Sequence, residues 1–432
     1  MHAAPGNYYD ATVGERPRRA TLQSSIEAEV CIVGAGFAGL ATALGLLERG
    51  VKDVVVLDAQ HVGFGASGRN GGFVFGGYSL DCADLLAQLG PQRAKAVYAL
   101  TRQAVDLIRQ RIARHAIDCE AVEGGALLAN WFDDPEILRR QQRLMADHFD
   151  VHWRFLDKRE LDGWVRSDRY SAALLEPDAF HFHPLKYALG EAAAIESLGG
   201  RIFEGSPVRD IATQGDSMRA STPHGSVTAR HVVIAGGGYL SQLVPQLERA
   251  ILPIATYVMA TEPLGDALHA LVPSRAAIYD TRFAFDYYRK LNDTRLLWGG
   301  RISVRDRSPD DIAQFLKDDM LKVFPGLRDA RIEHAWGGMM SYARHKMPQI
   351  GRLDSGPHKG LWYGLGFGGH GVAPTTAAGE LIARAIAQGE ALPAGFERYG
   401  LPRTWRPAGL MAAQATYSWL QFKDRLRERS SA

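Results

Sequence analysis

Residues 29–58 read EVCIVGAGFAGLATALGLLERGVKDVVVLD, and this stretch decides the fold. The apolar run 29–33 predicts a buried strand, residues 40–50 predict a helix, and residues 54–58 predict a second strand. The turn between the first strand and the helix carries three glycines, Gly34, Gly36 and Gly39. A strand, a glycine-rich turn, a helix and a second strand make up the unit that binds a dinucleotide in α/β proteins.

The small and acidic positions of this unit each have a physical use. Gly34 and Gly36 let the backbone approach a pyrophosphate at the helix N-terminus, and Gly39 lets the helix pack closely on the strand. Asp58 ends the second strand, where its carboxylate accepts hydrogen bonds from ribose hydroxyls. We also assign the neighbouring residues Phe37, Ala38 and Ala59 to the cofactor-binding site. The alternative is a tight turn that binds no ligand. The order and spacing of the strand, the glycine turn, the helix and the acid that ends the second strand argue against it.

A second glycine-rich stretch, VGFGASGRNGG at residues 62–72, follows the acidic strand directly. It contains five glycines and one charged residue, Arg69. An acid at position 58 occurs in proteins that bind FAD and in proteins that bind NAD, so it does not distinguish these cofactors. In a fold that binds NAD, however, the chain after the acidic strand usually continues directly into further βα units. A glycine-rich loop at this place indicates a long ligand that enters deep into the protein, so we predict FAD.

Composition limits the remaining possibilities. The chain of 432 residues is long enough for two domains, and its net charge of +2 argues against a nucleic-acid partner. Its three cysteines are scattered, so we expect reduced thiols in the cytoplasm and no metal site. The uncharged stretch 30–47 is long enough to span a bilayer, but its glycine spacing fits the nucleotide turn better.

Nucleotide-type segments recur in the middle and at the end of the chain. The strand in VVIAGGGY ends in Ala235 and Gly236, and residues 364–386 predict a glycine loop that opens a helix. Strand-like residues 254–262 and 276–301 lie between them, with a hairpin turn at Asn292 and Asp293. We therefore predict an α/β protein with a discontinuous Rossmann-type FAD-binding domain and an antiparallel or mixed β-sheet substrate domain.

The predicted domain limits follow from this alternation. The FAD-binding domain takes residues 25–88, 170–250 and 333–432, and the substrate domain takes 89–169 and 251–332. Helices are expected at 84–115, 135–147, 183–198 and 309–324. Val208, in a strand predicted around SPVRDI, is a candidate for the adenine edge, and core packing is an equal alternative for it.

The glycine clusters together resemble the D-amino-acid oxidase/sarcosine oxidase family of FAD-dependent amine oxidoreductases. The motifs are VCIVGAGFAGLATALGL, VGFGASGRNGGF, VVIAGGG and GFGGHGVAPTTAAGELIA, in that order along nearly the whole chain. The γ-glutamylputrescine oxidase branch looks nearest, because it also carries a pair of tyrosines before the first strand, here Tyr8 and Tyr9.

The resemblance implies transfer of a hydride from an amine-bearing carbon to flavin N5, followed by hydrolysis of the imine to a carbonyl compound and an amine or ammonia. It also implies two sets of flavin contacts. The first set lies along the ring, with Arg69 and Asn70 as donors: Ser67, Arg69, Asn70, Gly71 and Gly72. The second set packs at the pyrimidine end: Gly366, Phe367, Gly368, Gly369, His370, Gly371 and Val372.

Two departures from the family pattern bear on the chemistry. Sarcosine oxidases attach flavin through a cysteine, and the matching region HAWGGMMSYARHKMPQIG has none, so we predict non-covalent FAD. They also place an oxygen-activating lysine on a strand of the substrate domain, and the matching stretch TRLLWGGRI has none. The electron acceptor is therefore O2 or another acceptor such as a quinone.

Five residues are our candidates for the substrate site. Tyr257, Tyr288 and Trp336 are expected to form aromatic walls. Arg301 is expected to clamp a substrate carboxylate in bidentate fashion, through two nitrogens of its guanidinium group. His370 is the titratable residue of the last glycine loop. For each of them a purely structural role is the alternative.

The predicted substrate is γ-glutamylputrescine or a similar γ-glutamylated amine. Two other functions stay open: oxidation of a free amino acid such as sarcosine, glycine or a D-amino acid, and electron transfer or assembly without amine oxidation. The C-terminal stretch RPAGLMAAQATYSWLQFKDRLRERSS predicts an amphipathic helix. We expect it to dock on the FAD-binding domain, with a dimer contact or a membrane contact as the alternatives.

Overall fold

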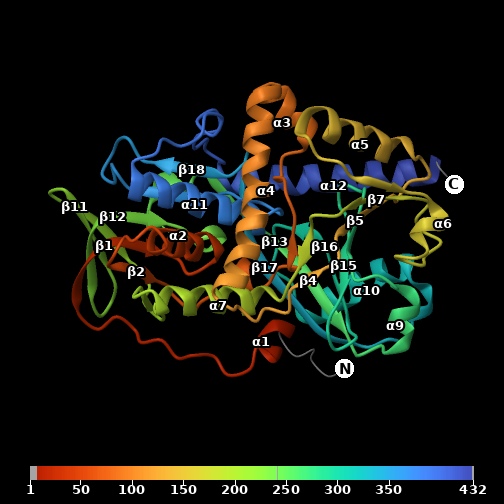
Figure 1. The fold of residues 1–432 in the computed structure, drawn as a ribbon, viewed down its shortest axis with the longest axis horizontal. Coiled ribbons are helices and arrows are strands. Elements are labelled where there is room, and N and C mark those ends of the chain that lie inside the picture. Colours follow the sequence, from red (N-terminus) through yellow and green to blue (C-terminus); the bar gives the residue numbers. More distant parts are fainter. Residues whose placement is uncertain (1–6, 241, 431–432) are drawn as a thin grey trace.

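The protein forms two large sheets, and a long helix crosses in front of the place where they meet (Figure 1). The computed structural model describes residues 7–240 and 242–430. Helix α4 (Pro91–Arg114) stands where the two halves meet. One half holds the glycine motif of residues 34–39, and the other holds the strands between residues 251 and 343.

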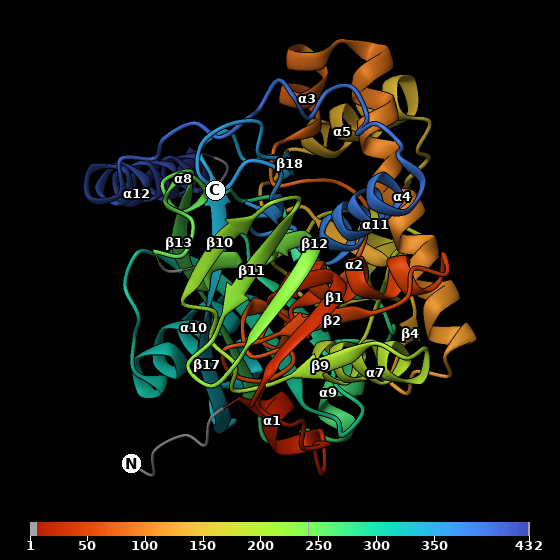
Figure 2. The same cartoon turned by 90° about the vertical axis from the view of Figure 1, so that its left-hand side faces the viewer.

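The first sheet contains the predicted nucleotide-binding strands, and Figure 2 shows them side by side. β1 lies parallel to both β2 and β12, as in a dinucleotide-binding unit. In spatial order the strands are β10 (Asp210–Gln214), β11 (Ser217–Ser221), β12 (Ser226–Ile234), β1 (Ser25–Val33), β2 (Val54–Leu57) and β9 (Arg201–Phe203), with β19 (Trp362–Leu365) beside β12 and β18 (Gln349–Arg352) beside β19.

Helix α2 (Phe37–Leu47) is buried on all sides, which explains why its sequence is apolar without a polar face. Helix α11 (Val372–Gln388) packs against α2 through small residues. A Cβ on Gly379 of α11 would lie 2.6 Å from the backbone nitrogen of Thr42. The two helices therefore approach each other more closely than larger side chains would allow.

The second sheet is mixed, because β5 and β14 run parallel while the other neighbouring strands run antiparallel. Helix α10 (Pro309–Val323) packs on it. In spatial order its strands are β17 (Ile332–Ala343), β13 (Ile251–Thr261), β16 (Leu296–Ser303), β15 (Tyr287–Lys290), β14 (Ala277–Asp280), β5 (Ala126–Ala129), β7 (Ala173–Glu176) and β6 (Arg154–Leu156). The predicted fold class, a Rossmann-type domain with a mixed-sheet domain, is confirmed.

The remaining elements connect or cover the two sheets. A small sheet joins β3 (Phe73–Val74), β8 (Phe180–His181) and β4 (Val122–Glu123). The other helices are α1 (Tyr8–Thr12), α3 (Cys82–Leu89), α5 (Glu136–Phe149), α6 (Lys158–Leu161), α7 (Pro184–Ser197), α8 (Pro245–Glu248), α9 (Asp266–Leu271) and α12 (Arg406–Ser430).

Two local predictions need correction, and a third segment agrees with its interpretation. The helix expected over 84–115 is two helices, α3 and α4, because Gly90 has a φ of 75° and Pro91 begins the second helix. Val208 lies before β10 and not inside a strand. The uncharged stretch 30–47 is divided between β1 and α2, and no helix of the described chain is long and apolar enough to cross a membrane.

The sheets also differ from the predicted domain limits. β7 falls in the predicted segment 170–250 and β17 in the segment 333–432, yet both belong to the second sheet. Conversely, α4 of the segment 89–169 packs against α11 beside the first sheet. Apolar strands of either domain look alike in sequence, so their partners could not be assigned from composition.

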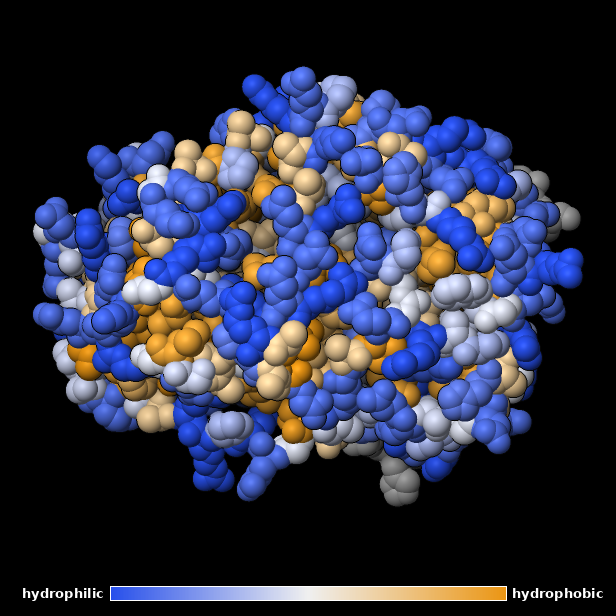
Figure 3. All heavy atoms as spheres, in the orientation of Figure 1, coloured by the Kyte–Doolittle hydropathy of each residue, from blue (hydrophilic) through white to orange (hydrophobic). Residues whose placement is uncertain are grey.

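The C-terminal helix docks on a different element from the one expected. α12 packs against β13 of the second sheet, and the hydroxyl of Tyr417 accepts a hydrogen bond of 3.2 Å from the backbone N–H of Ile302. Polar and charged side chains cover most of the face drawn in Figure 3, and apolar groups form small separate patches there. The hairpin turn at Asn292 and Asp293, between β15 and β16, is confirmed.

Replacement of Gly39 by Ala tests the closest backbone approach in the first sheet. A Cβ on Gly39 would lie 1.9 Å from the carbonyl oxygen of Gly34, so α2 must shift away from β1. We expect Gly39→Ala to lower the free energy of unfolding by about 1–3 kcal/mol, measured by urea denaturation. Gly326→Ala is the control, since a Cβ there meets nothing within 4 Å. Equal stability of the two variants would contradict this packing argument.

Candidate flavin and substrate site

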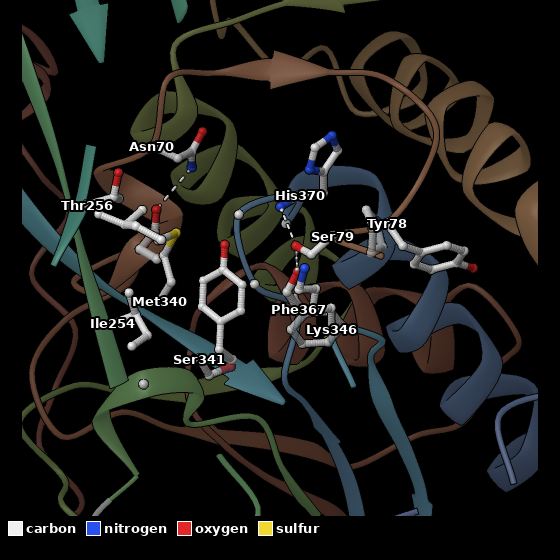
Figure 4. A pocket seen from close by; sticks show the side chains of 18 of the residues that line it. Asn70, Tyr78, Ser79, Ile254, Thr256, Met340, Ser341, Lys346, Phe367 and His370 are labelled. Carbon is white, nitrogen blue, oxygen red and sulfur yellow. Dashed lines mark hydrogen bonds between the residues drawn. The ribbon is translucent and has the colours of Figure 1, made fainter. Parts of the chain in front are cut away.

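One large cavity, of about 1300 Å³, runs from the glycine turn of the first sheet to the inner face of the second sheet. Gly34, Gly36 and Asp58 line its start, and the loop before α11 lines its middle. In Figure 4, Ile254 and Thr256 of β13 lie on one side of the cavity, with His370 on the other. The cavity therefore connects the predicted nucleotide site with the predicted substrate domain.

The nucleotide end of the cavity is built by a close crossing of three strands and turns. A Cβ on Gly34, whose φ is 114°, would lie 2.7 Å from the carbonyl oxygen of Ala235 at the end of β12. The N-cap residue of α2, Gly36, lines the cavity and provides no side-chain cap, and the first N–H of the helix, that of Phe37, donates to the hydroxyl of Ser67 at 2.9 Å. This arrangement leaves room and donors for a phosphate group.

Asp58 is held in place by two backbone donors. Its carboxylate accepts hydrogen bonds of 2.8 Å from the N–H groups of Ala35 and Gln60. Burial raises the pKa of the Asp58 carboxyl above its ordinary value, and the two backbone donors oppose that rise. The carboxylate thus lies beside the glycine turn, where an acid that binds ribose is expected.

The loop at 66–72 uses its polar side chains to hold itself together. The carboxamide nitrogen of Asn70 donates to the carbonyls of Ala66 and Ser67, at 3.1 and 2.9 Å. Arg69 donates to the carbonyls of Phe64 and Gly337, at 2.9 and 3.2 Å. Both residues line the cavity, but these donors serve the loop, which corrects the expectation that they point at a flavin.

The same loop is held from behind by residues far away in sequence. The hydroxyl of Tyr9 donates to the carbonyl of Asn70 at 2.8 Å, and Nε of Arg289 donates to the carbonyl of Gly71 at 2.7 Å. Trp336 donates through its ring nitrogen to the carbonyl of Arg69 at 2.9 Å. Sequence reasoning missed Arg289, since nothing near it in the chain indicates this contact.

His370 lies in the glycine loop that opens α11. Its backbone N–H donates to the hydroxyl of Ser79 at 3.2 Å, and that hydroxyl donates to the carbonyl of Phe367 at 3.2 Å (Figure 4). Burial lowers the pKa of His370 to about 4, so the imidazole is neutral near pH 7. Gly371, the N-cap residue of α11, lines the cavity and provides no side-chain cap. The positive end of the helix dipole therefore lies at the cavity.

An aromatic wall, which we define as Phe73, Phe75, Tyr279, Phe285 and Tyr287, follows on from His370. The Phe75 ring meets the imidazole edge to face, with centroids 5.1 Å apart, and stacks on Tyr279 at 5.5 Å. The remaining rings continue the wall in 5.4–6.3 Å steps. None of these five residues was among our sequence candidates.

The predicted aromatic walls are wrong for all three candidates, because none of them lines the cavity. Tyr288 is fully buried on the other face of its strand and stacks on Trp298 at 4.5 Å. Tyr257 packs against Phe315 in the core beneath the second sheet. Trp336 is buried behind the loop at 66–72, where it donates to that loop.

Arg301 lines the cavity, but its fork already holds a carboxylate. Its Nε and one terminal nitrogen donate to the two oxygens of Asp319, at 2.6 and 3.0 Å. Arg282, a second arginine that lines the cavity, donates to Asp280 and Asp286. The expected bidentate clamp on a substrate carboxylate is therefore wrong, since the protein supplies that carboxylate itself.

Most of the predicted cofactor residues line the cavity. All of them line the cavity except Gly39, Ala59, Gly72, Val208 and Gly366. Gly39 and Gly72 act behind the cavity surface, because a Cβ on either would meet a carbonyl oxygen. Val208 is partly buried and packs against the core of the first sheet, which was the alternative to a contact with the adenine edge.

Comparison with known proteins gives the family. A family model described as DAO, FAD dependent oxidoreductase, matches residues 29–385. The chain belongs to the DAO family. It is 38% identical over 382 residues to gamma-glutamylputrescine oxidoreductase of Escherichia coli, with 88% of each chain covered. It is 32% identical over 408 residues to the probable oxidoreductase OrdL of Haemophilus influenzae, with 93% of each covered.

A solved structure supports the fold assignment. Glycine oxidase from Bacillus cereus matches with a TM-score of 0.71 at 20% identity, covering 87% of this chain and 99% of that chain. As a member of the DAO family the chain is an FAD-dependent oxidoreductase of amines or amino acids. The cavity fits this cofactor, because two helix N-termini with glycine at the N-cap position, the Asp58 carboxylate and backbone cleared of side chains lie along it.

Replacement of Tyr9 by Phe tests the support behind the loop at 66–72. The change removes the hydrogen bond to the Asn70 carbonyl and keeps the buried ring. We expect the Kd for FAD to rise about 2- to 10-fold, the size of one net hydrogen bond, measured by titrating apoprotein and following flavin fluorescence.

Tyr8→Phe is the matched control for that experiment. The Tyr8 ring is equally buried, but its hydroxyl faces Asp293 instead of the loop. An unchanged Kd in Tyr9→Phe, or an equal change in both variants, would show that the Tyr9 hydroxyl does not support the loop.

Proposed function

We propose that this oxidoreductase acts on a γ-glutamylated amine, γ-glutamylputrescine or a close analogue. The amine-bearing carbon loses a hydride and the nitrogen loses a proton, so that a double bond forms between them and gives an imine. Water then converts the imine to an aldehyde and ammonia. The identity of 38% with gamma-glutamylputrescine oxidoreductase of Escherichia coli supports this substrate class.

The aromatic wall beside His370 is the observation that carries the proposal. An α-amino acid bears a carboxylate next to the reacting carbon, and that carboxylate needs a cation within the wall. The wall consists of rings and lies beside the neutral imidazole of His370. Two arginines that also line the cavity, Arg282 and Arg301, are already paired with Asp280, Asp286 and Asp319. A substrate whose reacting end is a plain amine suits these surroundings better.

The wall also favours the reactive protonation state of such an amine. Only a neutral amine can release a hydride, and transfer of an ammonium group from water to an apolar site lowers its pKa. Phe75 and Tyr279 exclude water from one side, and the neutral His370 ring places no negative charge there to retain the proton. The side chains around the reacting carbon thus favour loss of the amine proton before oxidation.

We assign the binding of FAD to the residues that line the cavity. Gly34, Gly36 and Asp58 hold the nucleotide half, and the loop at 66–72 and the first turn of α11 flank the ring. FAD, when bound, accepts the hydride. The positive end of the α11 dipole stabilises the negative charge that this transfer creates.

The flavin is proposed to be non-covalent. Met339 and Met340 line the cavity, and they lie in the region HAWGGMMSYARHKMPQIG that matches the cysteine-bearing region of sarcosine oxidases. Precipitation of the purified protein with acid should release the flavin into the supernatant, where its absorbance is measured. Flavin that stays with the pellet, and with Cys82 peptides after proteolysis, would contradict the proposal, since Cys82 also lines the cavity.

The electron acceptor is proposed to be O2 or a quinone, and the location cytoplasmic. The cysteines at 31, 82 and 119 are unpaired, as expected for reduced thiols.

Anaerobic flavin reduction across a substrate panel is the experiment that tests the function. Bleaching of the flavin absorbance should be faster with γ-glutamylputrescine than with sarcosine, glycine or D-alanine by about 100-fold or more in kcat/KM, the effect of leaving a carboxylate unpaired. Faster reduction by an amino acid would make the protein an amino-acid oxidoreductase. Failure of every amine and amino acid to bleach the flavin would favour a role in electron transfer or assembly.

A further inference from the structure

A side arm of the cavity carries a buried acid that neither the cofactor nor the aromatic wall uses. The arm extends between β5, β7, α3 and α5, and its surface is mostly apolar, formed by Leu128, Ile137 and Trp153. Glu176, the last residue of β7, lines this arm with only 8% of its surface exposed. A buried acid is expected to have a counter-charge.

Within the described chain, Glu176 has no cation in salt-bridge distance. Arg102, whose charge acts on it from farther away, is paired with Asp178 at 3.8 Å. The backbone N–H of Gly76 is the hydrogen-bond donor that faces the carboxyl group. Burial raises the pKa of Glu176 to about 8, which reflects the missing counter-charge.

The groups around Glu176 come from several elements and are uncharged near neutral pH. Burial raises the pKa of the Cys82 thiol on α3, of Tyr98 on α4 and of Tyr279 on β14, and Glu176 adds to that rise in each of them. Two phenol rings therefore adjoin the carboxyl group. Aromatic faces and a carboxylate together are the surroundings that stabilise an ammonium ion out of water.

Tyr279 connects this arm to the reacting region. It belongs to the aromatic wall, stacks on Phe75, and interacts electrostatically with Glu176. A substrate whose amine lies against the wall thus extends its other end past Tyr279 toward Glu176 within one continuous cavity.

We infer that Glu176 and the rings of Tyr98 and Tyr279 form a subsite for a second ammonium group of the substrate, several bonds away from the carbon that is oxidised. The inference rests on the proposed function, since it concerns the far end of the same amine. Two sources of that ammonium share this chemistry: the α-amino group of a γ-glutamyl unit, and the next amine of an unmodified diamine.

Pairs of substrates that differ by one ammonium group test the subsite. γ-Glutamylputrescine is compared with glutarylputrescine, which lacks only the α-amino group, and putrescine with butylamine. In the wild type, the member with the second ammonium should have the lower KM in one pair, which identifies the source. Glu176→Gln should raise that KM about 10- to 100-fold and leave its partner within about 2-fold, since a charge-assisted hydrogen bond is lost.

Glu191→Gln is the matched control. Glu191 is also fully buried with a pKa raised by burial to about 8, but it lies outside the cavity, next to Tyr187 and Arg111. It should alter neither substrate pair. Flavin content and thermal midpoint are measured for both variants to verify folding.

The pH dependence provides a second readout. In the wild type the KM of the dicationic substrate should fall as pH rises through about 8, because Glu176 ionises, and Glu176→Gln should lose that dependence. Equal changes for both members of a pair, or no change at all, would overturn the subsite. Faster wild-type flavin bleaching by γ-glutamylputrescine than by the amino acids upholds the proposed function independently of this result.

Discussion

The whole site depends on one backbone crossing, where Gly34 lies against Ala235 and Gly39 lies against Gly34. A Cβ on Gly34 would be 2.7 Å from the Ala235 carbonyl oxygen, and one on Gly39 would be 1.9 Å from the Gly34 carbonyl oxygen. β1, β12 and α2 can therefore meet only without side chains at these positions. The crossing places the N-terminus of α2 beside Asp58, at the nucleotide end of the cavity.

The loop at 66–72 depends on a second constraint, which acts through its carbonyl groups. Tyr9, Arg289 and Trp336 bind three successive carbonyls, those of Asn70, Gly71 and Arg69, from the side away from the cavity. They come from α1, β15 and β17, so the N-terminal helix and two strands of the second sheet contribute to one loop. Three donors on a glycine-rich loop replace the stability that its missing side chains cannot provide, because buried carbonyls need partners.

The nucleotide side of the site could be predicted from sequence, and the substrate side could not. Close backbone approach requires glycine, so it leaves a signal in composition at Gly34 and Gly36. An aromatic residue on a strand carries no such signal, since neighbours in a strand point to opposite faces. Tyr288 was chosen as a wall and lies in the core, whereas the adjacent Tyr287 lines the cavity.

The same reason explains the errors at other positions. Tyr257 was chosen and its neighbour Thr256 lines the cavity, because the register of β13 decides which face meets the cofactor side. Arg301 was correctly placed at the cavity, but Asp319 comes from α10, and a sequence does not reveal that a helix packs across the strand. The assignment of β7 and β17 to a sheet likewise depends on pairing partners distant in the chain.

The distribution of charge along the cavity gives the site a direction. Beside the aromatic wall, Arg282 and Arg301 are neutralised by acids, His370 is neutral, and the wall itself consists of rings, so these groups offer a charged substrate group little stabilisation. At the arm between α3 and α5, Glu176 has no cation near it in the described chain and gains a counter-charge from an ammonium group. A molecule with an amine at each end is bound more favourably when only the far amine remains charged, because an isolated charge in an apolar site costs several kcal/mol. The same separation of charge that favours loss of the proton at the reacting amine therefore also sets the orientation of the substrate.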